Sequence, residues 1–137
     1  MSDPRSVFYI SDRTGITAET LGQSLLTQFA LDCSPVSIPF TDSPEAVDAA
    51  IEQIEAAGRR NQSRPIVFST IIDAGLRNRL RRVNAVVLDF FDTFIGPLES
   101  ELGMESSHTI GRSHGIADPG AYKLRIDAMN YALSADD

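Results

Sequence analysis

Short apolar runs alternate along the chain with longer stretches in which apolar residues recur every three or four positions. The short runs are typical of buried strands and span residues 7–10, 36–40, 65–70 and 85–89. The longer stretches have the period of amphipathic helices. Because alternating strands and helices form parallel sheets through right-handed crossovers, the pattern predicts an α/β fold. We expect an open, mostly parallel, Rossmann-like sheet of about four strands in three layers, with helices on both faces.

Capping and breaking residues place several element boundaries. Pro39 cannot donate a ladder hydrogen bond, so the strand at 36–40 should lie at or near a sheet edge. Ser43 followed by Pro44 is typical of a helix N-cap and first helical position, and Gly58 is the expected end of that helix. Asp73 should cap the next helix, while the nearly continuous apolar run at 65–70 indicates a central strand.

The later helices are predicted from their apolar stripes. The helix that follows Asp73 should point three apolar side chains inward: Leu76, Leu80 and Val83. Its arginine side chains should then face solvent or a partner; they are Arg77, Arg79, Arg81 and Arg82. A short helix over 90–102 should end at Gly103, with Pro97 kinking it or delaying its start. A loop over 106–118 then leads into a closing helix over 121–135, with a stripe of Tyr122, Ile126, Met129 and Leu133.

Composition and charge limit the class of protein. The 137 residues are 42% hydrophobic and 23% charged, which suits one globular domain over residues 1–137. No apolar run approaches the ~20 residues that a membrane helix needs, and we expect a cytoplasmic protein with no membrane partner. Twelve Lys and Arg against nineteen Asp and Glu give a net charge of −7, which argues against nucleic acid as a partner. The single cysteine, Cys33, cannot form an internal disulfide.

The richest candidate site directly follows the first predicted strand. The carboxyl ends of parallel strands bind ligands in open α/β sheets, and small hydroxylated residues before a helix leave backbone amides for an anion such as phosphate. The same residues can equally serve only as turn and N-cap hydrogen-bond partners. The candidates for anion or partner binding in this loop are Ser11, Asp12, Arg13, Thr14, Gly15, Thr17 and Glu19.

The stretch from Asp12 to Thr17 also resembles the aspartyl-phosphate motif of haloacid-dehalogenase-type phosphotransferases. In that alternative the chain is a stand-alone phosphohydrolase with Asp12 as its nucleophile. Such catalysis needs a second acid, a lysine and magnesium-binding carboxylates. The position of the second acid holds Thr14, the one lysine is Lys123, and Asp89 with Asp92 is an imperfect metal pair. We therefore rank this alternative second.

A second polar group lies in the loop at 106–118 and the helix after it. Arg112 could bind phosphate with its forked guanidinium, and His114 with Asp118 could form an acid–base pair. Tyr122 and Arg125 follow within the helix. Side chains of polar loops often do no more than form local hydrogen bonds that order the loop, and the residues alone favour this interpretation. The histidine spacing fits no zinc pattern, so no metal site is expected.

Arginines cluster between Arg59 and Arg82. The usual explanation is a solvated, charge-balanced face, since Glu45, Glu52 and Glu55 lie on the preceding predicted helix. The alternative is a docking face for an acidic protein.

Several motifs together resemble one known family over essentially the whole chain. They are residues 7–22, 64–70, 88–91 and 111–115, then Tyr122 with residues 125–128, and finally Asp136 and Asp137. In this order they are similar to the N-terminal half of the phosphoenolpyruvate synthase regulatory proteins, which are relatives of the pyruvate, phosphate dikinase regulatory proteins. Arg13 departs from the pattern, because a small residue is expected there.

The resemblance implies a bifunctional regulator. Family members use ADP to phosphorylate a threonine of phosphoenolpyruvate synthase, which inactivates the synthase, and use inorganic phosphate to remove that group as pyrophosphate. The family's nucleotide site is a P-loop in a C-terminal kinase domain. No G-x-x-x-x-G-K-[ST] motif occurs in these 137 residues, so we expect no cofactor in this chain and no catalysis by it alone.

The resemblance also implies a partner and an assembly. The partner would be phosphoenolpyruvate synthase, and the assembly a homodimer. It raises the expectation that the loops at 11–19 and 112–118 are functional surfaces, but it assigns no catalytic residue.

Overall fold

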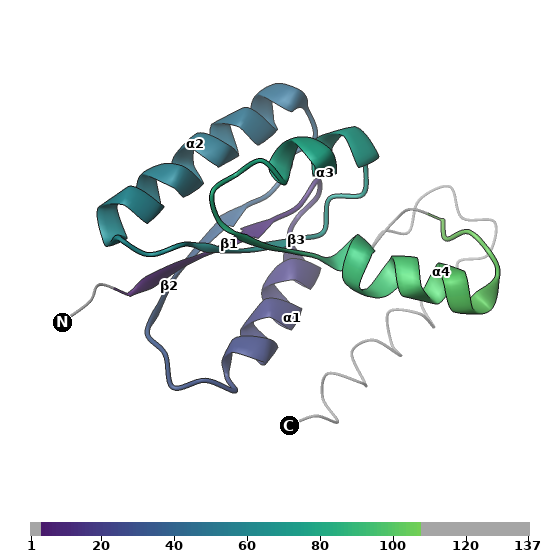
Figure 1. Cartoon of the computed structure of the whole chain (residues 1–137), viewed down its shortest axis with the longest axis horizontal. Coiled ribbons are helices and arrows are strands. Elements are labelled where there is room, and N and C mark those ends of the chain that lie inside the picture. The colour runs from purple at the N-terminus through teal and green to yellow at the C-terminus, as the bar shows by residue number, and fades with distance from the viewer. Residues whose placement is uncertain (1–3, 108–137) are drawn as a thin grey trace.

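The computed structural model describes residues 4–107 of the chain, and within them four parallel strands form one sheet (Figure 1). The strands are β1 (Arg5–Ile10), β2 (Cys33–Ile38), β3 (Ile66–Ser69) and β4 (Val86–Asp89), in the order β2-β1-β3-β4. Phe8 on β1 lies opposite Val36 on β2 and Val67 on β3. The predicted Rossmann-like α/β sheet is confirmed, with β1 and β3 in its interior.

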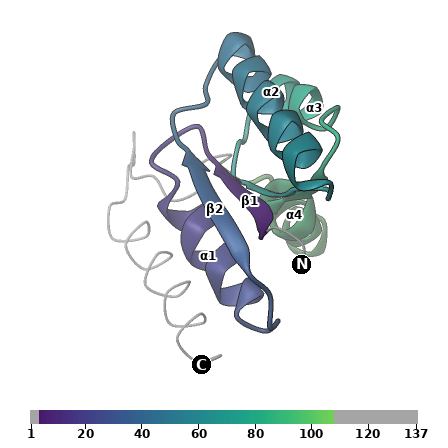
Figure 2. The same ribbon diagram turned by 90° about the vertical axis from the view of Figure 1, so that its left-hand side faces the viewer.

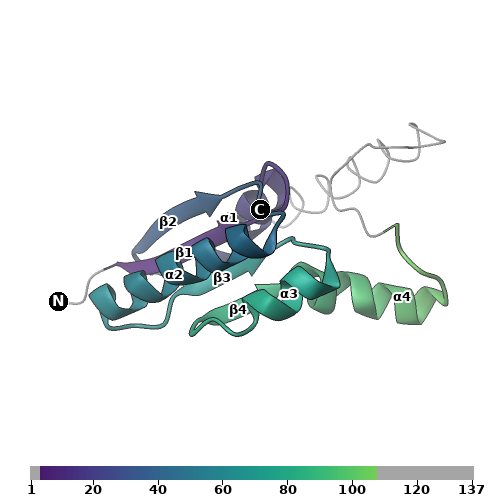
Figure 3. The same ribbon diagram turned by 90° about the horizontal axis from the view of Figure 1, so that it is seen from above.

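Helices cover both faces of this sheet, which gives the three predicted layers (Figures 2 and 3). Helix α1 (Ile16–Leu26) packs on one face, while α2 (Pro44–Asn61) and α3 (Ala74–Leu80) pack on the other. A π-helical turn, η1 (Phe91–Ile95), follows β4 and continues directly into α4 (Gly96–Leu102). In the described part of the chain, no helix has both the length and the apolar character needed to cross a membrane.

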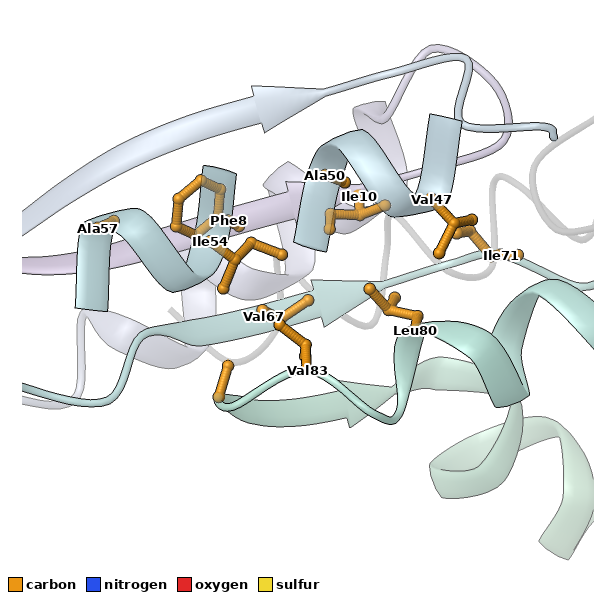
Figure 4. Packing of buried hydrophobic residues seen from close by; sticks show 11 residues of the cluster. Phe8, Ile10, Val47, Ala50, Ile54, Ala57, Val67, Ile71, Leu80 and Val83 are labelled. Atoms are coloured by element: carbon orange, nitrogen blue, oxygen red, sulfur yellow. The ribbon is translucent and has the colours of Figure 1, made fainter. Parts of the chain in front are cut away.

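Alternation along β1 divides the core between the two faces. Phe8 and Ile10 point toward α2, where they meet Ile54 in the larger cluster (Figure 4). Val7 and Tyr9 point the other way and pack with Ala18, Phe68 and Phe90. This two-sided burial is the reason for the nearly continuous apolar sequence of β1 and β3.

The predicted boundaries of α2 were right at its start and wrong at its end. Ser43 is the N-cap, and its Oγ accepts a hydrogen bond of 3.1 Å from the amide of Ala46. Gly58 does not stop the helix, which continues to Asn61 and ends at Gln62 with φ 54°. Gly58 instead lies against Pro65, since a Cβ at this glycine would be 3.1 Å from the proline Cδ. A close approach, rather than a helix end, accounts for the glycine.

Two other predicted boundaries also shifted. Strand β2 is an edge strand as predicted, but it spans Cys33–Ile38, so Pro39 lies just beyond it. Helix α3 ends at Leu80, and Val83 is buried from the following turn.

The predicted helix over 90–102 has two parts. It is π-helical up to Ile95 and becomes α-helical at Gly96, with Pro97 in the first α-helical turn. Proline has no amide hydrogen to donate to the preceding turn, and the change of helix type occurs there. Gly103 ends α4 with φ 65°, as predicted. The predicted helix over 121–135, and the loop from residue 108 on, lie outside the described residues.

Candidate functional site

The loop from β1 to α1 is tied to the loop that follows β2. The amide of Thr41 donates to the carbonyl of Ser11 at 2.8 Å, and the amide of Phe40 donates to the carbonyl of Arg13 at 2.8 Å. The Ser11 side chain is buried, and its Oγ accepts from the amide of Arg13 at 2.9 Å. Ser11 therefore has the turn-forming role that the sequence left open.

Helix α1 begins without a side-chain cap. Its N-cap is Gly15 with φ 86°, a backbone conformation that favours glycine. Thr14 is exposed and Thr17 is half-buried, and neither hydroxyl makes a hydrogen bond within residues 4–107. The N-capping interpretation of these threonines is thus not supported. The first amides of α1 and the positive end of its dipole face the loop that holds exposed Arg13.

Glu19 faces the sheet edge rather than the loop. Its Oε1 accepts a hydrogen bond of 2.5 Å from Ser37 Oγ on β2. The carboxylate also contributes to the raised pKa of Tyr9, although burial of the phenol is the larger cause and Cys33 adds to it. Glu19 therefore connects α1 to β2.

Two adjoining hollows lie at the carboxyl ends of the strands, where the sequence placed the site. One, of about 400 Å³, is lined by Asp12, Ile72, Asp73, Ala74, Arg77 and Phe91. The other, of about 360 Å³, is lined by Asp12, Asp42, Pro44, Asp73 and Leu76. Residues that follow β1, β2, β3 and β4 thus meet at one rim.

Arg77 lines the first of these hollows, which corrects its predicted solvent-facing position. It is only 9% exposed. Its Nε lies 3.0 Å from Asp89 Oδ2, and its Nη2 lies 2.6 Å from Asp92 Oδ1. The guanidinium also stacks over the Phe91 ring, with 4.2 Å from Cζ to the ring centroid. A buried carboxylate at the end of β4 needs a compensating charge, and Arg77 provides it.

The two carboxylates considered as a metal pair are occupied by protein groups. Asp89 Oδ1 accepts from the amides of Phe91 at 2.8 Å and Asp92 at 3.4 Å, while Arg81 pairs with Asp92 and lies 3.6 Å from Asp89. Within residues 4–107, no group of three or more His, Cys, Asp or Glu side chains is placed to hold a metal ion. Asp89 and Asp92 serve to fix the start of η1 against α3.

Acidic groups predominate in the hollows themselves. Asp73 caps α3 as predicted, with its Oδ2 accepting from the amide of Leu76 at 2.9 Å. Asp12, Asp42 and Asp73 line the hollows, whereas the positive charges of Arg77 and Arg81 are matched by Asp89 and Asp92. Among the described residues that line the hollows, carboxylates outnumber guanidinium groups, so an anion is better placed at the amide end of α1.

Away from the rim, Arg79 forms a two-point ion pair with Asp48 of α2. Its Nε and Nη2 donate to the two carboxylate oxygens at 2.7 and 2.8 Å. The hydrogen bonds from Arg79 lower the pKa of Asp48, and the same contact raises the pKa of Arg79. At this position the arginine cluster is charge-balanced, mainly through Asp48 and with a smaller contribution from Glu45, one of the glutamates named from the sequence.

Arg112, His114, Asp118, Tyr122 and Arg125 all lie outside the described residues.

Sequence reasoning missed the role of Arg77, although one signal for it was present. Arg77 precedes the buried Leu80 by three residues, a spacing that places both side chains on one helix face.

Comparison with known proteins gives consistent matches along the chain. Residues 7–137 match the family model described as Kinase/pyrophosphorylase. A phosphoenolpyruvate synthase regulatory protein of Alkalilimnicola ehrlichii is 59% identical over 133 residues, which are 97% of this chain and 48% of the relative. One of Halorhodospira halophila is 56% identical over 138 residues, 100% of this chain and 50% of the relative. The chain spans about half the length of the curated relatives it matches, and it belongs to the kinase/pyrophosphorylase family.

Proposed function

We propose that this chain is the regulatory and substrate-recognition part of a bifunctional serine/threonine kinase and phosphorylase acting on phosphoenolpyruvate synthase. The full protein would inactivate the synthase by ADP-dependent threonine phosphorylation and reactivate it by phosphate-dependent dephosphorylation that releases pyrophosphate. The observation that carries the proposal is the family match over residues 7–137, together with relatives named as regulators of that synthase.

In this proposal, the described part of the chain recognises the substrate protein and does not itself transfer the phosphoryl group. Phosphoryl transfer requires groups that cradle and neutralise the phosphates, typically a P-loop with its lysine. The one lysine of these 137 residues is Lys123, and no P-loop motif is present. The rim instead offers an uncapped helix end beside Arg13 and two acidic hollows. We propose that the loop from Ser11 to Gly15, with the first turn of α1, contacts an anion or the partner protein at this rim.

A domain exchange tests this proposal. The matching 133 residues of the Alkalilimnicola ehrlichii relative are replaced by this chain, and the hybrid is incubated with phosphoenolpyruvate synthase and ADP. Loss of synthase activity with appearance of phosphothreonine, detected by mass spectrometry, supports the proposal. The unaltered relative is the positive control, and this chain by itself should leave the synthase active. A folded but inactive hybrid, or inactivation by the chain alone, contradicts it.

The same preparation tests the aspartyl-phosphate alternative. Asp12 lines both hollows, which is where a nucleophile at the end of β1 would lie. That alternative requires magnesium-dependent release of phosphate from a small ester by the chain, and loss of this activity in Asp12→Asn. Our proposal expects no phosphate release from the wild-type chain or from the Asp12→Asn variant.

A further inference from the structure

Residues Phe91–Leu102 form a helical arm that comprises η1 and α4. The arm projects beyond the end of the sheet (Figures 1 and 3), and neither of its two helical parts contains a buried residue. Isolated helices shorter than ~12–15 residues are marginal in water, and Gly96 and Pro97 both lower helix propensity. A helix of this length that buries so little is expected to gain stability from a partner.

The arm carries an apolar stripe on one side. Phe94, Leu98 and Leu102 follow one another at intervals of four residues and are 43%, 53% and 63% exposed, and Met104 directly after the arm is 65% exposed. Side chains four residues apart lie next to each other on a helix. Exposed apolar side chains that are contiguous on a surface mark interaction sites, whereas scattered ones do not.

The border of the stripe is acidic. Residues 83–107 include five acidic residues and no Lys, Arg or His. Asp89 and Asp92 are matched by arginines of α3 and the turn after it, which leaves exposed Glu101 and Glu105 beside the stripe. Like charges facing each other are costly at an interface, so a second copy of this arm is a poor occupant. A partner with basic side chains around an apolar face fits better.

The base of the arm is held firmly. Asp89 Oδ1 accepts from the amide of Phe91, and Arg77 and Arg81 both pair with Asp92 in the first turn of η1. These contacts set the direction in which the arm leaves the sheet. A surface that is oriented before binding loses less conformational entropy when it binds.

We propose that the stripe of Phe94, Leu98 and Leu102 is a docking surface for an apolar face bordered by Lys or Arg. The inference rests on the proposed function, which makes phosphoenolpyruvate synthase the protein that carries this face.

Titration calorimetry of this chain with phosphoenolpyruvate synthase tests the docking surface. The double substitution Leu98→Ser with Leu102→Ser should weaken binding about tenfold or more, because a few central apolar side chains dominate most interfaces. The matched control is Leu25→Ser with Phe29→Ser, which alters two apolar residues of comparable exposure, one in the last turn of α1 and one just beyond it. The control should bind like the wild type.

The acidic border is tested by charge reversal. Glu101→Lys with Glu105→Lys should weaken binding at low ionic strength and flatten its salt dependence, because salt screens exposed charge pairs. The control is Glu45→Lys with Glu52→Lys, two exposed positions of α2. It should leave the affinity and its salt dependence unchanged.

Each alternative outcome separates the two proposals. If the wild type binds and the serine variant binds equally well, the docking surface is wrong and the proposed function stands. Absence of wild-type binding counts against the proposed function as well. If the serine substitutions dissociate a dimer in sedimentation, the occupant is a second copy. If they lower the melting temperature by several degrees without changing binding, this chain covers the stripe itself. Either of the last two results overturns the inference.

Discussion

Arg77 and Arg79 show how far position alone decides what a residue does. They lie two residues apart in α3, and each pairs with carboxylates at hydrogen-bond distance. Arg77 is buried with Asp89, whereas Arg79 and Asp48 are both open to solvent. A buried ion is costly without its partner, while an exposed pair is screened by water and contributes little. The same residue type is structural at one position and dispensable at the other.

Arg77→Ala should therefore destabilise the protein strongly. It removes the closer ion-pair partner of the buried Asp89 carboxylate and leaves only Arg81 at 3.6 Å, so we expect the free energy of unfolding to fall by about 3 kcal/mol, the lower end of the range for a broken buried pair. Urea unfolding followed by circular dichroism measures this change. Arg79→Ala is the control and should give a much smaller loss. Equal losses in the two variants would show that burial of Arg77 has no energetic consequence.

The burial of Tyr9 leads us to expect that the protein loses stability at alkaline pH. Burial of its side chain, with a smaller contribution from Cys33 and then Glu19, raises the pKa of the phenol above its ordinary value of 10.0. The folded state therefore holds the phenolic proton more tightly than the unfolded chain. The resulting stability is fully present below pH 10.0 and is lost as the pH rises through the higher folded-state pKa.

Tyr9→Phe removes this proton and should flatten the loss of stability on the alkaline side. Unfolding free energies at a series of pH values above and below 10.0 provide the test for the wild type and the variant. Parallel pH profiles for the two proteins would contradict the assignment.

At the scale of elements, α1 depends on a close approach to the sheet. A Cβ at Gly22 would lie 2.5 Å from Tyr9 Cε1 and 2.9 Å from Phe68 Cδ2. These two rings are stacked with their centroids 5.8 Å apart, and both are 2% exposed. Rings packed in this way have little room to move. Gly22 therefore sets the distance between α1 and the two interior strands.

Gly22→Ala should destabilise the protein although alanine favours helices. Overpacking a core costs about 1–3 kcal/mol, which exceeds the helix gain of about 0.5–1 kcal/mol for replacing glycine. Gly96→Ala in α4 is the matched control, because its Cβ would meet only the Phe91 carbonyl oxygen at 3.5 Å. Thermal unfolding should show a lower melting temperature for the first variant and an unchanged or higher one for the second. The opposite order would mean that α1 can shift away from the sheet.

At the scale of the whole molecule, stability should decrease from the interior strands outward to the arm. β1 and β3 have neighbours on both sides and helices on both faces, whereas η1 and α4 bury no residue. Amides that open only by global unfolding exchange slowest. Hydrogen exchange should therefore be slowest in peptides covering residues 5–10 and 66–69 and much faster in residues 91–102.

Addition of phosphoenolpyruvate synthase should slow exchange in the arm more than in α2. Uniform exchange along the chain would contradict the predicted gradient. Protection confined to α2 would instead place the partner at the arginine cluster between Arg59 and Arg82.

Much of the fold and part of the site could be predicted because their signals are local. The periods of the apolar residues determined the four strands and their helices, Ser43 and Asp73 marked two helix starts, and the strand ends located the rim. Gly58 was misread because a glycine at a helix end and a glycine against Pro65 look alike in sequence. Arg77 was misplaced because its partners, Asp89 and Asp92, follow it by 12 and 15 residues.

The sequence by itself determined the class of fold, the parallel sheet and the edge where ligands are expected, since these follow from periodicity and from the handedness of crossovers. Only the tertiary structure decided the charge of the rim and the exposure of the arm. Both depend on which side chains meet across separate elements: Arg77 of α3 pairs with carboxylates after β4, while Asp12, Asp42 and Asp73 come together around the hollows from three separate loops. Burial and charge compensation arise from such long-range contacts, which local sequence patterns do not encode.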